Sequence, residues 1–216
     1  MSNVLNNQAR LYAIADMQTC QKNEIDIDLF ANAFFSAGGK NLQYRDKISS
    51  GSIINANVEK LKNISDKHSG NLIINDYVEI ANAYNLPVHI GWDTPQLMGN
   101  TKFPETKFGR STHNMEEIKK ANAEIPLADH IGFGAVFKSN TKKNVKVNQN
   151  DILAALKNWD KEIVFIGGIT IENFTQLPNQ TRCYYAVIQD FFTNGCLPEN
   201  IYNYTKEFLE KITRNS

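Results

Sequence analysis

The sequence predicts a single (β/α)8 TIM barrel, an α/β fold, and three observations lead to this expectation. Short apolar runs that suit strands alternate with segments of helical periodicity, and we count eight of each. Such alternation requires parallel strands joined by right-handed crossovers. The length of 216 residues suits one barrel, and polar side chains follow most strands where one rim would lie. A doubly wound open sheet is the competing topology, but it usually has fewer units.

The expected strands are brief and bounded by polar residues or glycine. The most informative stretch, 128–137, is apolar, carries Gly132 and Gly134 on one face, and ends in a polar loop. A strand face without side chains lets another group approach the backbone closely. The expected strand segments are 11–15, 41–44, 72–74, 87–91, 106–111, 128–137, 162–166 and 184–188.

The expected helices show apolar residues at intervals of three or four. Asp76 and Thr170 are placed to cap the helices that follow them. Asn114 with Glu117 resembles a capping box, and Pro198 opens the last helix. The helical segments to which bounds can be given are 25–35, 54–64, 77–84, 114–118, 152–156, 171–177 and 198–212.

Composition excludes some classes of partner. The 23 basic and 23 acidic residues cancel, which argues against bulk binding of nucleic acid or an anionic membrane. No apolar run is long enough to span a membrane, and the first residues lack the apolar core of a signal peptide. The three cysteines lack C-x-x-C spacing and suit free thiols in a reducing compartment. We expect a cytoplasmic protein with one domain over 1–216, in which 1–9 are a polar extension; a homo-oligomer stays open.

A cationic group follows the second strand. Gln43, Arg45 and Lys47 occupy alternate positions, so an extended backbone points all three side chains the same way. One amide and two cations suit a pyrophosphate or a diacid. The alternative is an ordinary surface turn.

Acidic residues follow the third and fourth strands. Asn75 and Asp76 end the third strand, and Asp93 follows the fourth. Asp76 and Asp93 are candidate ligands for Mg²⁺, which prefers carboxylate oxygens and water. The alternative for Asp76 is a plain helix cap. His89, within the fourth strand, is more often a core histidine than a ligand.

Anion-binding groups also follow the later strands. The loop after the sixth strand offers hydroxyls and ammonium groups, and Gly167 with Gly168 places backbone N–H groups before a predicted helix. Because active sites of such barrels lie at the carboxyl ends of the strands, these residues converge on one rim. Two anion-binding places predict two small phosphorylated substrates, or one with a phosphate at each end. The candidates on this side are Ser111, His113, Ser139, Thr141, Lys142, Gly167, Gly168, Ile188 and Gln189.

Six short motifs occur in order over nearly the whole chain, from Arg10 to about Phe192. They are Gln43-x-Arg45-x-Lys47, Ile74-Asn75-Asp76, Val88-His89-Ile90-Gly91, Ser111-x-His113, Gly132-x-Gly134-x-Val136-Phe137 with Thr141-Lys142, and Ile166-Gly167-Gly168-Ile169-Thr170. At these residues the chain resembles the thiamine-phosphate synthase family. The resemblance implies a (β/α)8 barrel that joins hydroxymethylpyrimidine pyrophosphate to hydroxyethylthiazole phosphate, giving thiamine phosphate and pyrophosphate.

The resemblance also implies roles for the candidates. Gln43, Arg45 and Lys47 would hold the leaving pyrophosphate with Mg²⁺, while Asp76 would bind the metal and Asn75 would assist. Ser111 and Lys142 would contact the pyrimidine substrate. The thiazole phosphate would lie against Ser139, Thr141 and the Gly168 amide. Arg45, Lys47, Ser111 and Lys142 are therefore the expected catalytic residues.

Some positions depart from the family pattern and leave two alternatives open. Asp93 lies one place earlier than the family's metal ligand, Trp92 replaces an amide, and Gln189 stands where a small serine is usual and would crowd the thiazole phosphate. The related thiazole tautomerases share Gly109-Arg110-Ser111-x-His113, but their usual catalytic His is Ala135 here. A degenerate barrel that only binds a phosphorylated ligand is the third reading.

Overall fold

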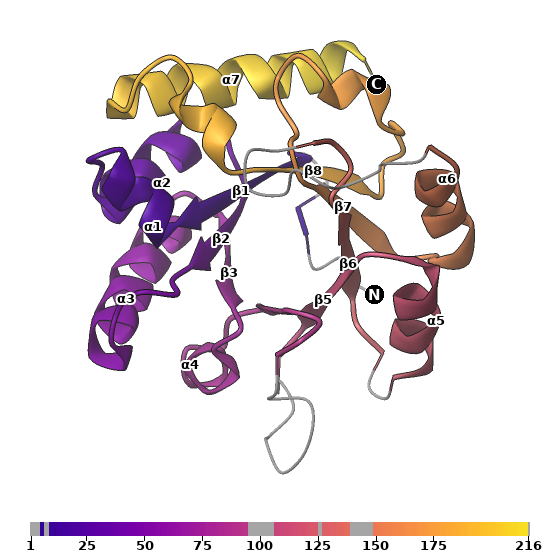
Figure 1. The fold of residues 1–216 in the computed structure, drawn as a ribbon. Helices are drawn as coiled ribbons and strands as arrows, with labels where there is room; N and C mark the ends of the chain where they lie inside the picture. Colours follow the sequence, from indigo (N-terminus) through magenta and orange to yellow (C-terminus); the bar gives the residue numbers. More distant parts are fainter. Residues whose placement is uncertain (1–4, 7–8, 95–105, 125–126, 139–148, 216) are drawn as a thin grey trace.

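The computed structural model describes residues 5–6, 9–94, 106–124, 127–138 and 149–215, and it contains a closed barrel of eight parallel strands. Each strand pairs with the next, and β8 pairs with β1. The predicted (β/α)8 barrel is confirmed, with helices around the strands (Figure 1). The strands are β1 (Leu11–Asp16), β2 (Asn41–Arg45), β3 (Asn71–Asn75), β4 (Val88–Ile90), β5 (Phe108–Thr112), β6 (His130–Gly134), β7 (Glu162–Ile166) and β8 (Cys183–Val187).

The described residues include seven α-helices. One of them, α1, was not expected; it begins because the Asp16 carboxylate accepts a hydrogen bond from the Thr19 N–H at 3.1 Å. The expected cap at Asn114 is confirmed, because its side chain accepts from the Glu117 N–H. The helices are α1 (Met17–Lys22), α2 (Ile27–Ser36), α3 (Gly51–Lys67), α4 (Val78–Ala83), α5 (Met115–Ala123), α6 (Gln149–Asn158) and α7 (Pro198–Arg214).

The α-helix predicted over 171–177 is wrong. This connection holds only a short 3₁₀ helix, Phe174–Gln176. The Asn173 side chain accepts from the Thr170 N–H and donates to the Gly168 carbonyl, so it bonds the loop backbone instead of leaving it to a helix. Pro178 then follows directly after Leu177. The glycine pair therefore does not precede a full helix.

Two packed regions support the barrel. The larger lies between the strands and the helices, where α7 packs against α2. The smaller fills the barrel interior and includes Tyr12, Ile73, Val164 and Tyr184. Leu5, which was expected in a polar extension, is buried in this inner region, and its N–H donates to Glu162.

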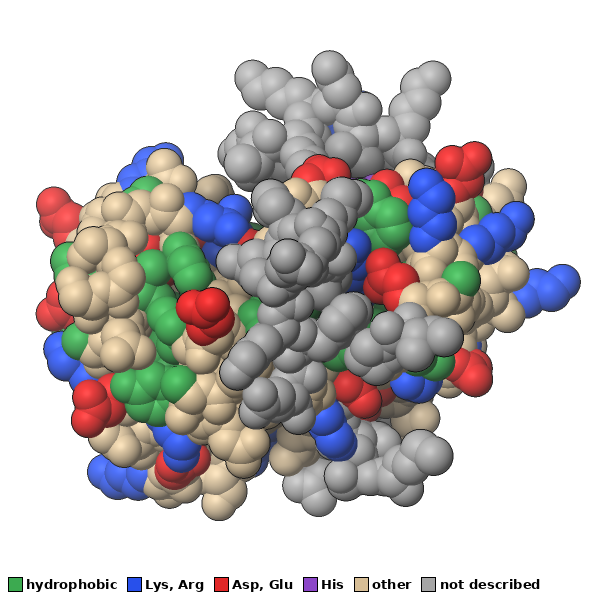
Figure 2. All heavy atoms as spheres, turned by 90° about the horizontal axis from the view of Figure 1, so that it is seen from below, with side chains coloured by type: hydrophobic (Ala, Val, Ile, Leu, Met, Phe, Trp, Pro, Cys, Tyr) green, Lys and Arg blue, Asp and Glu red, His purple; other side chains and the backbone are tan. Residues whose placement is uncertain are grey.

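The face of the molecule drawn in Figure 2 carries charges of both signs. Figure 2 shows Lys and Arg side chains interspersed with Asp and Glu over one face of the molecule. This distribution agrees with the cancelling charges of the sequence. Among the described residues, no helix combines the length and the apolar character that crossing a membrane needs.

Candidate functional site

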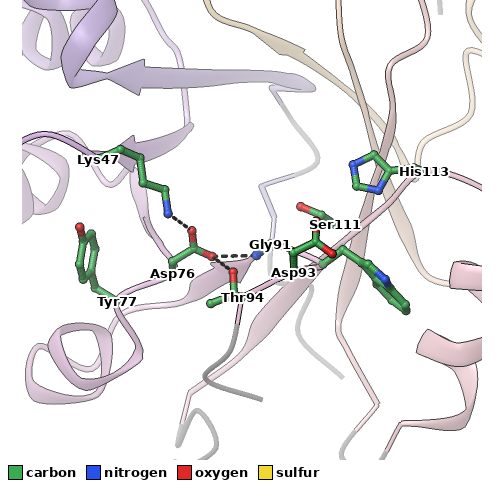
Figure 3. A pocket seen from close by; sticks show the side chains of 9 residues that line it. Lys47, Asp76, Tyr77, Gly91, Asp93, Thr94, Ser111 and His113 are labelled. Carbon is green, nitrogen blue, oxygen red and sulfur yellow. Dashed lines mark hydrogen bonds and ion pairs between the residues drawn. The ribbon is translucent and has the colours of Figure 1, made fainter. Parts of the chain in front are cut away.

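Asp76, directly after β3, receives four hydrogen bonds at the mouth of the barrel. Its Oδ1 accepts from the Gly91 N–H at 2.7 Å and from the Thr94 hydroxyl at 2.8 Å. Its Oδ2 accepts from the Lys47 ammonium (Figure 3). The same oxygen accepts from the Asn75 amide at 2.6 Å. Burial alone would raise the pKa of this carboxyl, but these hydrogen bonds and the charge of Lys47 outweigh it and lower the pKa. Asp76 is therefore held as an anion.

The prediction that Asp76 caps the following helix is wrong. Its backbone takes a left-handed conformation, with φ of +65°, and Tyr77 is the residue at the start of α4. This turn sends the carboxylate toward β4 and toward the loop after β2. Asp76 thus joins three strand ends and is not a plain helix cap.

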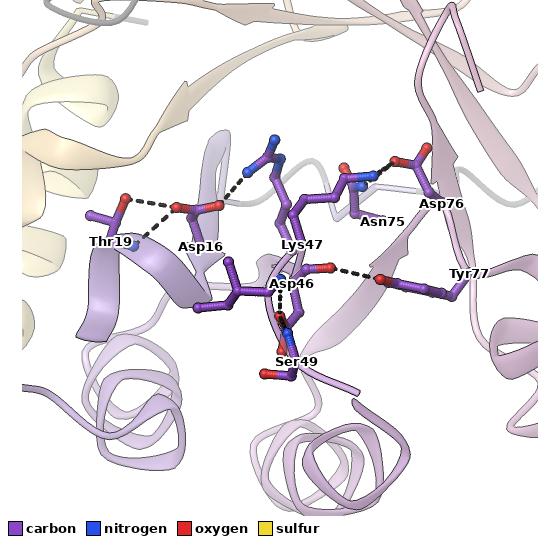
Figure 4. Close-up of polar contacts among 10 residues, drawn as sticks. Asp16, Thr19, Asp46, Lys47, Ser49, Asn75, Asp76 and Tyr77 are labelled. Atoms are coloured by element: carbon purple, nitrogen blue, oxygen red, sulfur yellow. Dashed lines mark hydrogen bonds and ion pairs between the residues drawn. The ribbon is translucent and has the colours of Figure 1, made fainter. Parts of the chain in front are cut away.

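The cations after β2 form two ion pairs with neighbouring strands. Arg45 pairs with Asp16 at the end of β1, and Lys47 pairs with Asp76 (Figure 4). Asp46 lies between them in the sequence and faces the other way, where it accepts from the backbone N–H groups of Ile48 and Ser49. The predicted alternation therefore holds at this loop. Both cations remain more than one-third exposed, at 38% and 44% of their side chains.

Gln43, the third member of the predicted cationic group, lies deeper. It is buried, and its amide donates to the Tyr12 hydroxyl at 2.9 Å inside the barrel. Burial raises the pKa of the Tyr12 phenol, while the bond from Gln43 opposes this effect. Gln43 therefore supports the floor of the site, one layer below Arg45.

A second polar group lies on the β4 and β5 side. His89 Nε2 lies 3.0 Å from Ser111 Oγ, and His89 Nδ1 lies 3.2 Å from His130 Nε2. Burial lowers the pKa of His89 to about 4; nearby Asp76 opposes this effect and Arg110 adds to it. His89 is thus a neutral hydrogen-bonding group near neutral pH.

The mouth contains a cavity of about 510 Å³ that joins these groups. Lys47, Asp76 and Thr94 lie on one side of it, and Ser111 and His113 on the other (Figure 3). His113 is partly exposed and bonds Glu117 at 2.9 Å. The full lining consists of Lys47, Asp76, Tyr77, Gly91, Trp92, Asp93, Thr94, Ser111 and His113.

The donor set suits a small divalent cation. Asp76 and the exposed Asp93 line the same cavity. The Lys47 ammonium binds the Asp76 carboxylate in the way that a metal ion would. Within the described ranges no group of three or more His, Cys, Asp or Glu side chains could hold a metal. Mg²⁺ does not need such a cage, because it commonly uses one or two carboxylates with waters and substrate phosphates. The residues present therefore fit Mg²⁺ supported by a phosphorylated substrate.

The β7 and β8 side of the mouth is built differently. Gly167 and Gly168 both have positive φ, and a Cβ on Gly168 would lie 2.4 Å from the Lys138 carbonyl oxygen. Ile188 is half-buried against the inner core, while Gln189 is exposed in a short 3₁₀ helix. The candidates Ser139, Thr141 and Lys142 lie outside the described residues.

Sequence reasoning missed several residues of this site. Asp16 was not among the candidates, although it pairs with Arg45 and caps α1. His130 was overlooked within an apolar stretch. A detectable signal for it existed: Gly109 and Gly132 leave the space that the two imidazoles fill, since a Cβ on Gly109 would lie 2.0 Å from His130 Nε2.

Trp92 lines the cavity, and the Arg110 guanidinium lies 4.7 Å from the centre of its ring. Arg110 also donates to the Gly91 carbonyl at 2.7 Å, so it fixes the loop after β4. Trp92 therefore forms one wall of the site, stacked on a buried cation.

Comparisons of the sequence with known proteins point to one family. A family model described as thiamine monophosphate synthase matches residues 11–191. The thiamine-phosphate synthase of Methanobrevibacter smithii is 40% identical over 122 residues, 55% of this chain and 57% of that protein. That of Persephonella marina is 29% identical over 211 residues, 94% of this chain and 97% of that protein. The chain thus spans little more than half of the first relative and nearly all of the second.

A solved structure has the same fold. Thiamine phosphate pyrophosphorylase from Pyrococcus furiosus superposes with a TM-score of 0.75 at 19% identity, covering 95% of this chain and 98% of that one. At this identity, the similarity concerns the fold alone. The residues of the site must therefore be argued from their own geometry.

Proposed function

Because the chain belongs to the thiamine monophosphate synthase family, we propose that it joins hydroxymethylpyrimidine pyrophosphate to hydroxyethylthiazole phosphate. The products are thiamine phosphate and pyrophosphate. The observation that carries this proposal is the pair of ion pairs, Arg45–Asp16 and Lys47–Asp76, at the barrel mouth, the second of them lining the cavity. Two exposed cations held next to anionic carboxylates suit a substrate that combines negative phosphates with a divalent cation.

The reaction needs no nucleophilic side chain. The C–O bond between the pyrimidine methylene and the pyrophosphate breaks, the bonding pair leaves with the pyrophosphate, and the thiazole nitrogen lone pair forms the new C–N bond. Catalysis then depends on stabilising the departing charge and on holding the two substrates in line. Cys20 and Cys183 are buried, and burial raises their thiol pKa values, which suits thiols without a catalytic role.

The cations after β2 take the leaving group in this proposal. Arg45 and Lys47 exchange their carboxylate partners for pyrophosphate oxygens when the substrate binds. Gln43 and Asn75 support them from the layer below. Arg45 offers a planar pair of N–H groups for two oxygens, whereas Lys47 offers a point charge.

Asp76 and Asp93 are the proposed Mg²⁺ ligands. When bound, the metal supplies positive charge for the pyrophosphate oxygens. Asp76 is kept anionic by its hydrogen bonds, and release of Lys47 frees one acceptor position of its Oδ2, which still accepts from Asn75. Asp93 lies on the same cavity and completes the set with substrate oxygens and water.

The other substrate lies on the β6 to β8 side. Gly168 offers its backbone N–H, and the loop after β6 offers Ser139 and Thr141 for the thiazole phosphate. Ile188 and Gln189 border that place. Ser111, which bonds His89, faces the pyrimidine substrate, and the family pattern assigns Lys142 to the same substrate. These roles rest on the family pattern, and the protein is proposed to act in the cytoplasm on small phosphorylated substrates.

A coupling assay tests the proposal. Purified protein is mixed with both substrates and Mg²⁺, and thiamine phosphate is measured with and without EDTA. Product that EDTA abolishes supports the synthase and the metal site. Tight binding of either substrate without product would instead favour a binding protein, and isomerisation of a thiazole precursor without Mg²⁺ would favour a tautomerase.

A further inference from the structure

Two histidines and a serine form a hydrogen-bonded chain that leads from the barrel interior to the cavity. His130 Nε2 lies 3.2 Å from His89 Nδ1, and His89 Nε2 lies 3.0 Å from Ser111 Oγ. Ser111 lines the cavity, whereas His130 is fully buried. This series of hydrogen bonds therefore has one end in the core and one end at the site.

The barrel has space made for this chain. A Cβ on Gly109 would lie 2.0 Å from His130 Nε2, and a Cβ on Gly132 would lie 3.0 Å from His89 Cε1. The two rings stack with centroids 5.3 Å apart. Both imidazoles thus lie against glycine backbone, in positions that a side chain on either glycine would disturb.

His130, at the inner end of this series, determines which group donates and which accepts in each hydrogen bond. His130 Nδ1 is buried and has no hydrogen-bond partner in the described part of the chain. Burial, with His89 nearby, lowers the pKa of His130, so the ring is neutral and carries one hydrogen. A buried N–H without an acceptor is rarer and more costly than a buried lone pair without a donor. The hydrogen of His130 therefore belongs on Nε2, where His89 accepts it.

The position of the hydrogen on His130 determines the other two groups of the series. A His89 Nδ1 that accepts carries no hydrogen, so the single hydrogen of neutral His89 is on Nε2 and is donated to Ser111 Oγ. The Ser111 hydroxyl, once it accepts from His89, has its own hydrogen free for the cavity. With the opposite direction, Ser111 would donate to His89 and could offer the cavity only a lone pair.

We propose that His130 is a positioning residue that fixes the tautomer of His89 and thereby makes Ser111 a hydrogen-bond donor toward the substrate. The acceptor is a ring nitrogen or a phosphate oxygen of the pyrimidine substrate, both of which only accept hydrogen bonds. The acceptor's identity rests on the proposed function, whereas the tautomer does not.

The tautomer is measured on the free protein by long-range ¹H–¹⁵N NMR of the imidazole rings. The chain has four histidines, so single substitutions assign the spectrum, and His68, on the outer surface against Phe35, serves as an internal reference. The expected result is that His89 and His130 both carry hydrogen on Nε2 and none on Nδ1. A hydrogen on His89 Nδ1 would overturn the inference, whether or not the protein is a synthase.

Two substitutions at His130 distinguish the effect of its hydrogen bond from the effect of its ring shape. His130→Phe removes the donor, and His89 is then expected to populate both tautomers. His130→Gln retains an N–H at a similar place, and His89 is expected to keep the wild-type tautomer. If the His89 tautomer is the same in both variants, His130 does not set it. Thermal melting checks that each variant is folded.

Kinetics test the connection to Ser111. In the coupling assay, His130→Phe is expected to lower kcat/KM for the pyrimidine pyrophosphate about three- to tenfold, the size of one hydrogen bond, and His130→Gln to restore most of it. In a Ser111→Ala background, His130→Phe should have no further effect. Additive losses would show that His130 acts elsewhere. His68→Gln is the matched control and should leave kcat/KM unchanged.

Discussion

The two sides of the barrel mouth differ in the groups that they offer to an anion. On the β1 to β3 side, two cations are exposed and already paired with carboxylates of neighbouring strands. On the β7 to β8 side, the described residues include a glycine pair with positive φ, the half-buried Ile188 and the exposed Gln189. The first side suits a highly charged group with a metal. The second offers the backbone N–H groups of a glycine turn, which suit a phosphate.

The loops on the second side are also held by a different kind of contact. Asp190 accepts from the Ile171 N–H at 2.8 Å and from the Tyr204 hydroxyl at 2.6 Å. This carboxylate joins the loops after β7 and β8 to α7, and it forms no ion pair with any cation that the structure describes. Asp190 therefore has an architectural role, whereas Lys47 and Asp76 on the first side line the cavity.

The largest expected effect follows loss of charge at Asp76. Asp76→Asn removes the partner of Lys47 and a proposed metal ligand, so the coupling rate should fall about 10³-fold. The measurement is kcat over a range of Mg²⁺ concentrations. Asp46→Asn is the matched control, because Asp46 lies in the adjacent loop and faces away from the cavity. Equal losses in the two variants would mean that the loop, and not the carboxylate, is responsible.

Arg45→Ala should have the next largest effect. Loss of one charged donor to the departing pyrophosphate should lower kcat about 10²-fold, and Arg45→Lys should restore it only in part. Lys40→Ala is the control, since Lys40 lies at the opposite end of β2 and donates to the His68 carbonyl. A normal kcat in Arg45→Ala would remove Arg45 from the proposed site.

A change on the glycine side should act on the other substrate. Gly168→Ala strains a backbone at φ of +63° and brings a Cβ to 2.4 Å from the Lys138 carbonyl oxygen. We expect about a tenfold rise in KM for the thiazole phosphate and a loss of roughly 1–3 kcal/mol of unfolding free energy. Gly51→Ala, which meets nothing within 4 Å, is the control. An equal rise in the KM values for both substrates would contradict a separate role for the glycine side.

The smallest effect concerns the pH dependence of the free energy of unfolding. It tests His89, which lies between the two sides of the mouth. Because the pKa of His89 is lowered from 6.5 to about 4, the unfolded chain binds a proton that the folded chain does not between these values. The free energy of unfolding should therefore fall as pH drops from 6.5 to about 4, by at most about 1.4 kcal/mol per pH unit for this group. Above pH 6.5 this group has no effect. Urea unfolding of wild type and His89→Gln measures the difference, and parallel pH profiles would contradict a neutral buried His89.

Much of the fold could be predicted because its signals are local. Apolar runs of strand length alternate with helical periodicity, and this pattern alone indicates eight parallel strands. The failures also have local causes. The helix over 171–177 is replaced because the Asn173 side chain bonds the loop backbone, and α1 was missed because its six residues carry little periodicity.

The candidate site was predictable only in part. The alternation after β2 indicated that Arg45 and Lys47 share a side, but no local pattern pairs them with Asp16 and Asp76. His130 looked like one residue of an apolar strand, although it contacts His89, 41 positions away. Gly109 and Gly132 were the available signal, and their meaning depends on which side chains face them across the barrel.

The sequence by itself determined the barrel and the rim on which polar residues gather, because both follow from the period of apolar residues and from parallel strand direction. Only the tertiary structure decided the partners. Arg45 reaches Asp16 and Lys47 reaches Asp76, each across 29 positions, once strands β1, β2 and β3 lie side by side. Hydrogen bonds and ion pairs act over a few ångströms, and closure of the barrel sets those distances.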